Sequence, residues 1–91
     1  MSELIKQGNS FVIEENGERA AEITFVPQGE DTLVIDHTFV SEALRGQKIA
    51  EALVKRVVDY ARETNKMIIP VCSYALSQFK RKKEYHDVWK Q

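Results

Sequence analysis

The stretch LRGQKIAEAL, residues Leu44–Leu53, decides how this chain folds. It follows a strand-like segment directly and places a glycine turn at the start of an amphipathic helix. The first N–H groups of a helix have no helical partner, and the helix dipole adds partial positive charge there. Arg45 and Lys48 add two full cations. The stretch therefore predicts an anion site suited to a phosphate or pyrophosphate, the alternative being a capped helix without a ligand.

The residues before this stretch predict an antiparallel meander. The β-forming segment Ser10–Glu15 is followed by Asn16-Gly17, which is a strong hairpin signal. Apolar and polar residues then alternate over residues 21–25, and turn-forming residues at 27–31 break the pattern. We expect a third strand over Thr32–Val40.

The residues after the stretch predict a βαβ unit. A helix is expected over Gln47–Thr64, and the apolar run Met67–Cys72 is typical of a strand buried on both faces. With Thr32–Val40 these segments form a right-handed crossover between parallel strands. Pro70 cannot donate to a sheet, so it indicates either an edge strand or a point where the strands part. One face of the expected helix is apolar: Ile49, Ala50, Leu53, Val54, Val57, Val58 and Ala61.

The C-terminal residues predict further helix. A second helix is expected over Ser73–Lys82, and the tail Glu84–Gln91 adds another turn. The fold class is therefore α/β (α+β): an antiparallel N-terminal meander, a βαβ unit and C-terminal helices. A length of 91 residues predicts a single domain over residues 1–91.

The composition narrows the classes of partner. The formal net charge of −1 argues against an electrostatic nucleic-acid binder. A single cysteine fits a reducing compartment, and no apolar run approaches the roughly 20 residues that span a bilayer. The first residues lack the apolar core of a signal peptide, and no His, Cys or carboxylate spacing suggests a metal. We expect a cytoplasmic protein without nucleic-acid, membrane or metal partners.

Three features meet at one edge of the predicted sheet. In parallel sheets, ligands bind beyond the carboxyl ends of the strands. Phe39 and Val40 end one strand, Cys72 ends the other, and the glycine turn lies at the same edge. Parting of the strands near Pro70 would open a slot between them.

The turn itself resembles a known signature. The sequence RGQKIA, Arg45–Ala50, is similar to the acetyl-CoA signature Arg/Gln-x-x-Gly-x-Gly/Ala of the GCN5-related N-acetyltransferases. Arg45 and Ala50 match its first and last positions, whereas Lys48 stands where glycine is usual. The segments Asp36–Val40, Val71–Tyr74 and Glu84-Tyr85 resemble the small, single-domain branch of the same family.

The resemblance implies a fold, a cosubstrate and a reaction. It implies a splayed parallel strand pair whose slot takes the pantetheine arm of acetyl-CoA, and a backbone N–H near the end of the strand that polarises the thioester carbonyl. The acetyl group would pass to an amine of a small molecule or a protein. The implied cofactor-binding residues are Phe39, Val40, Arg45, Gly46, Gln47, Lys48, Ile49 and Ala50.

Cys72 and His37 are the candidate catalytic residues. Cys72 stands at a strand end before a helix, where the dipole favours a thiolate, so it could relay the acetyl group, act as an acid or line the slot. The alternative is a small buried apolar residue. His37 could be a base. It is expected to share a strand face with Leu33, Ile35 and Phe39, so a hydrogen-bonded histidine on that face is the alternative.

Two tyrosines and one basic run are further candidates for the site. Tyr74 and Tyr85 could each protonate a thiolate, although aromatic packing is their usual role. The basic run Lys80–Lys83 could contact a phosphate of the cofactor or an acidic partner, or form a solvated helix end. Two other functions compete with acetyl transfer: a non-catalytic CoA-binding module and a small protein-interaction domain. The sequence predicts no oligomeric state.

Overall fold

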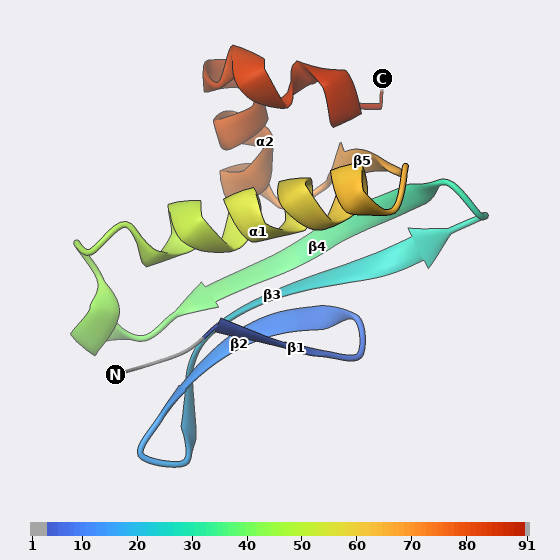
Figure 1. Cartoon of the computed structure of the whole chain (residues 1–91). Helices are drawn as coiled ribbons and strands as arrows, with labels where there is room; N and C mark the ends of the chain where they lie inside the picture. Colours follow the sequence, from blue (N-terminus) through green and yellow to red (C-terminus); the bar gives the residue numbers. More distant parts are fainter. Residues whose placement is uncertain (1–3, 91) are drawn as a thin grey trace.

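The structure is a computed structural model that describes residues 4–90. A five-stranded sheet with strand order β1-β2-β3-β4-β5 forms one layer (Figure 1). The first four strands are antiparallel, and β5 is parallel to β4, which confirms the predicted fold class. The strands are β1 (Leu4–Gln7), β2 (Ser10–Glu15), β3 (Glu18–Gln28), β4 (Thr32–Val40) and β5 (Met67–Pro70).

The strand β1 was not predicted. It pairs antiparallel with β2 through a tight turn in which Gly8 has a φ of 57°, a conformation that glycine adopts at little cost. The segment Leu4–Gln7 has no clear alternation of apolar and polar residues, so its sequence alone gave no strand signal.

Two α-helices lie on the same side of the sheet (Figure 1). They are α1 (Ile49–Glu63) and α2 (Ser73–Arg81), and two short 3-10 helices flank them, η1 (Glu42–Leu44) and η2 (Lys83–Val88). The helix η2 is the predicted C-terminal turn. Because Lys48 adopts a left-handed conformation (φ 60°, ψ 29°), α1 begins two residues later than predicted. Among residues 4–90, none of the helices is long and apolar enough to cross a membrane.

The core lies between α1 and the sheet. All five residues of the apolar stripe from Leu53 to Ala61 are completely buried, as predicted, and they pack against the helix-facing side of β2, β3 and β4. Three aromatic rings close one end of this core, with centroids 5.8 Å apart in each pair: Phe11, Phe25 and Tyr60. The amphipathic stripe therefore fixes which face of the sheet is covered.

A β-bulge in β4 changes which residues face the core. Phe25 pairs with Ile35 but the preceding Thr24 pairs with His37, so Asp36 is an extra residue in β4. An extra residue shifts every later side chain to the other face. Leu33 and Ile35 face the core, whereas His37 and Phe39 are exposed on the opposite face. The prediction that these four residues share one face was therefore wrong.

The strands β4 and β5 part after a short parallel pairing. Their register runs from Thr32 opposite Met67 to Ile35 opposite Pro70. Beyond this point the backbone N–H groups of both Val71 and Cys72 donate to the carbonyl oxygen of Ile35, at 3.0 and 3.1 Å. Both explanations of Pro70 hold, since β5 is the edge strand and its pairing ends at the proline.

Replacing Leu53 by alanine tests the core. Leu53 is fully buried, so Leu53→Ala should lower the free energy of unfolding by about 2–5 kcal/mol through lost burial and a residual cavity. The matched control is Lys55→Ala on the exposed side of the same helix. It removes an exposed ion pair with Asp59 and should cost less than about 1 kcal/mol. Urea unfolding measures the free energy of unfolding of both variants, and equal losses in the two would contradict the placement of Leu53 in the core.

Candidate functional site

The loop before α1 presents a run of free backbone donors. The first helical hydrogen bond runs from Ala52 N–H to the Lys48 carbonyl, and the Arg45 N–H bonds to Glu42. Within residues 4–90, no protein group accepts a hydrogen bond from the N–H groups of residues 46–51. The side chain of Lys48, the N-cap residue of α1, makes no capping hydrogen bond with the described residues 4–90. The start of α1 therefore has the unpaired donors and the dipole of an anion site.

Two residues of this loop have a positive φ. Gly46 has a φ of 87°, and a Cβ built on it would meet no atom within 4 Å. Glycine is therefore favoured at residue 46 by the backbone conformation rather than by lack of space. Lys48 has a φ of 60°, which costs a residue with a side chain roughly 1–2 kcal/mol. Lys48 stands where the signature has glycine, and it nevertheless adopts the backbone conformation that glycine would favour.

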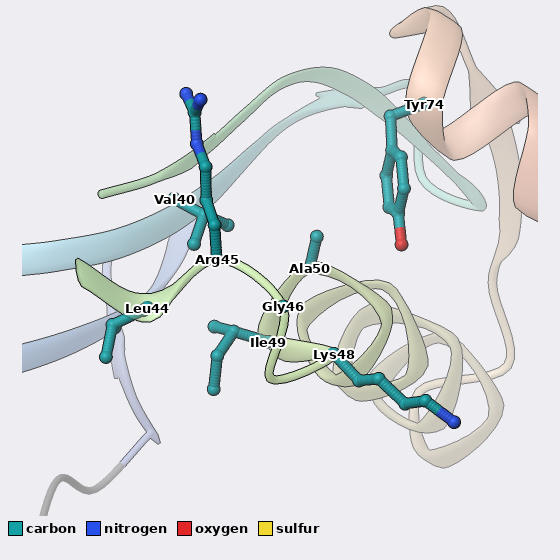
Figure 2. A pocket seen from close by; sticks show the side chains of 8 residues that line it. All are labelled: Val40, Leu44, Arg45, Gly46, Lys48, Ile49, Ala50 and Tyr74. Carbon is teal, nitrogen blue, oxygen red and sulfur yellow. The ribbon is translucent and has the colours of Figure 1, made fainter. Parts of the chain in front are cut away.

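A cavity of about 150 Å³ opens beside this loop (Figure 2). The cavity is smaller than the roughly 300–1,000 Å³ of pockets that enclose a drug-sized ligand, so it can hold only part of a large one. The side chains of Arg45 and Lys48 point in different directions from the loop (Figure 2). The lining residues are Val40, Leu44, Arg45, Gly46, Lys48, Ile49, Ala50 and Tyr74.

Six of the eight predicted cofactor-binding residues line this cavity. The two that do not are Gln47, which lies within the run of free N–H groups, and Phe39, whose side chain is exposed on the opposite face of the sheet. The sequence analysis did not assign Leu44 to the cofactor site, and it gave Tyr74 two possible roles, a proton donor to a thiolate or a packing residue. Leu44 anchors the short helix η1 in the core, which its place at the start of the opening stretch could have suggested.

Tyr74 extends from α2 toward the start of α1, with its hydroxyl group directed to the loop (Figure 2). Burial raises the pKa of this hydroxyl, and the charge of Glu51 raises it further. Tyr74 is therefore protonated at neutral pH and can donate a hydrogen bond into the cavity. Tyr85, the other tyrosine considered, is 5% exposed and packs against Phe79 with ring centroids 5.5 Å apart.

Cys72 stands immediately before α2, beside the parting of the strands. Burial alone would raise the pKa of its thiol. Hydrogen bonds with the Thr38 hydroxyl and with the backbone N–H groups of Ala75, Tyr74 and Thr38 outweigh burial, so the pKa lies below that of an ordinary cysteine. The Thr38 Oγ1 and Cys72 Sγ atoms are 3.4 Å apart. Cys72 therefore forms a thiolate more readily than an ordinary cysteine does, and two of the N–H groups that stabilise it, those of Tyr74 and Ala75, belong to the first turn of α2.

Sequence reasoning missed Thr38. Its side chain faces Cys72 only because the bulge at Asp36 turns residue 38 toward the helices. The polar run Asp36–Thr38 within an otherwise apolar strand was the available signal. His37, the other candidate, is exposed on the opposite face and does not line the cavity. The basic run Lys80–Lys83 ends α2 and begins η2.

Comparisons with known proteins identify the family. A family model described as GCN5-related N-acetyl-transferase matches residues 10–88. The solution structure of a GCN5-like protein from Staphylococcus aureus is 37% identical, with a TM-score of 0.81, and the match covers 97% of this chain and 87% of that one. No match was found among the curated proteins. The chain therefore belongs to the GCN5-related N-acetyltransferase family.

More distant structures share the fold. N-acetylglutamate synthase from Neisseria gonorrhoeae, complexed with coenzyme A and N-acetyl-glutamate, is 14% identical with a TM-score of 0.65; the match covers 87% of this chain and 22% of that one. The ribosomal-protein-S18-alanine N-acetyltransferase from Escherichia coli is 13% identical with a TM-score of 0.64, over 84% of this chain and 53% of that one. In both cases the shared fold spans most of this chain and only part of the other protein.

Replacing Thr38 tests the environment of the thiol. Thr38→Val removes the hydroxyl group, so the pKa of Cys72 should rise toward that of an ordinary cysteine and alkylation by iodoacetamide at neutral pH should slow. The pH dependence of the alkylation rate measures this change. Thr64→Val is the matched control, because that hydroxyl bonds to the carbonyl of Tyr60 at the far end of α1. If the midpoint of this pH dependence were the same in Thr38→Val as in the native protein, the hydrogen bond between Thr38 and Cys72 would be contradicted.

Proposed function

We propose that this protein binds acetyl-CoA at the start of α1 and transfers the acetyl group to an amine. The observation that carries the proposal is the run of free N–H groups over residues 46–51, with the cation of Arg45 just before the run and that of Lys48 within it. Such a run matches the chemistry of a pyrophosphate. Family membership supports the same ligand, as does the related synthase whose structure was determined with coenzyme A.

The remainder of acetyl-CoA would follow the sheet edge. From the loop, the cavity continues past Val40 to Tyr74, and the strand β4 has no β5 partner beyond Ile35 within residues 4–90. We place the pantetheine arm along this free edge and the thioester near Cys72. A backbone N–H at Phe39 or Val40 would polarise its carbonyl. The basic run Lys80–Lys83 is a candidate for the phosphate on the ribose. A single cysteine fits a cytoplasmic location.

The chemistry requires few groups. The neutral amine nitrogen attacks the thioester carbonyl carbon, a C–N bond forms and the C–S bond breaks. One proton leaves the nitrogen and one ends on the sulfur, so the products are an amide and free CoA. The protonated Tyr74 hydroxyl can supply the proton to sulfur. Positioning of the two reactants can supply much of the rate. His37 stays a candidate base on the amine side, and Cys72 a candidate acetyl relay.

Substituting Gly46 tests the binding site. Gly46→Ala should weaken acetyl-CoA binding on the order of tenfold, because an alanine strains the left-handed turn and moves the N–H groups. The matched control is Gly29→Ala in the turn between β3 and β4, where φ is 67° and the space around a Cβ is equally open. Both variants should lose similar stability. Isothermal titration then separates them, and equal affinities for acetyl-CoA would refute the placement of the site.

Substituting Cys72 tests its role in transfer. If Cys72 relays the acetyl group, Cys72→Ala should abolish acetylation of an amine panel and should retain acetyl-CoA binding. Mass spectrometry of the native protein would then detect an acetyl group on Cys72. Full activity of Cys72→Ala would remove the relay. If the native protein bound acetyl-CoA but released no free thiol with any amine, the protein would be a non-catalytic CoA-binding module and not an acetyltransferase.

A further inference from the structure

A second cavity, of about 320 Å³, lies at the other end of α1 from the anion loop. It is about twice as large as the cavity beside Tyr74, and its volume falls at the lower end of the roughly 300–1,000 Å³ that is usual for small-molecule sites. At about 1.5 Å per residue, the 15 residues of α1 place the two cavities roughly 20 Å apart. The second cavity is therefore a separate site.

The way in which α1 ends leaves this space open. The Lys66 N–H donates to the Ala61 carbonyl oxygen at 2.8 Å, and Asn65 has a left-handed φ of 57°. The Asn65 N–H donates to the Arg62 carbonyl oxygen at 3.3 Å. Together these features form a Schellman motif, in which the side chains at the positions of Ala61 and Lys66 are commonly apolar and in contact. Here one is a methyl group and the other carries a charge, so the pair fills less apolar space, and both residues line the cavity.

The other walls of the cavity come from β5 and η2, which lie beside the end of α1 (Figure 1). Arg62 joins α1 to η2, because its Nε and Nη2 atoms donate to the two carboxylate oxygens of Asp87 at 3.1 and 2.9 Å. Beyond η2, the Lys90 N–H donates to the Ile68 carbonyl oxygen of β5 at 2.8 Å. The fold therefore holds the walls of the cavity in place without a ligand.

The charged groups around the cavity favour an anion. Both carboxylate oxygens of Asp87 accept hydrogen bonds from Arg62, which hold the pKa of this carboxyl below its usual value. Lys66 donates to the Glu30 carbonyl oxygen at 2.8 Å and forms no ion pair within residues 4–90. Its positive charge is therefore the one that no carboxylate offsets. The partial negative charge at the end of α1 is only about half a unit, and the Schellman motif pairs the carbonyl groups that carry much of it.

The lining also includes apolar side chains. Ala61 and Val88 are buried and Met67 is half-buried, whereas the side chains of Arg62 and Asp87 are exposed at the rim. We propose that this cavity binds a small carboxylate that carries a short apolar group, with the carboxylate beside Lys66 and the apolar group on the buried lining. A phosphate would leave the apolar lining unused, and a neutral molecule would leave the charge of Lys66 without a partner.

Titration with sodium benzoate, followed by NMR of the backbone amides, tests this site. Benzoate has one carboxylate and one small apolar ring, so we expect saturable shifts with a Kd of about 1 mM, largest for the amides of residues 61–67 and 87–88. Lys66→Gln keeps most of the side chain and removes its charge, and the Kd should rise about tenfold. The matched control, Lys55→Gln, removes a charge from the exposed side of the same helix and should change the Kd less than about twofold.

Benzylamine and inorganic phosphate complete the test. Each should bind about tenfold more weakly than benzoate, because benzylamine reverses the charge and phosphate lacks the apolar ring. Tighter binding of benzylamine than of benzoate overturns the choice of an anion, and equal binding of phosphate overturns the apolar contact. Benzoate shifts that are absent or largest at residues 46–51, or an equal Kd in Lys66→Gln and the control, overturn the site itself.

Discussion

The hydrogen bonds to one carbonyl oxygen, that of Ile35, organise the site. Because Val71 and Cys72 both donate to it, β5 can follow β4 no further, and the strands part at Pro70. The same arrangement sets Cys72 at the start of α2 and within 3.4 Å of Thr38. It also leaves the last part of β4 without a neighbour on the β5 side within residues 4–90. Proline at residue 70 suits this end because it has no N–H to leave unpaired.

Much of the fold could be predicted from periodicity. The apolar stripe of α1, the Asn16-Gly17 hairpin and the run before Pro70 each have a signal contained in a few neighbouring residues, so the meander and the βαβ unit were correctly expected. The strand β1 could not be predicted, since its stability comes from pairing with β2. The bulge at Asp36 could not be predicted either, because register depends on the partner strand, and this error placed His37 on the wrong face.

For the candidate site too, local features could be predicted and long-range contacts could not. The anion loop was found because its signal lies in consecutive residues, from Arg45 to Ala50, and six predicted residues line one cavity. The contact between Thr38 and Cys72 joins residues 34 positions apart and depends on the bulge, so no local pattern contained it. Lys48 departs from the family signature, but its left-handed conformation is one that the glycine of the signature would favour.

The central claim is that the backbone donors at the start of α1 hold the pyrophosphate of acetyl-CoA. Titration of the protein with acetyl-CoA, followed by NMR of the backbone amides, tests this claim most directly. The account predicts saturable shifts that are largest for the amides of residues 46–51, since their N–H groups are the unpaired ones. Saturable shifts confined to another surface, or no shift at millimolar acetyl-CoA, would contradict it.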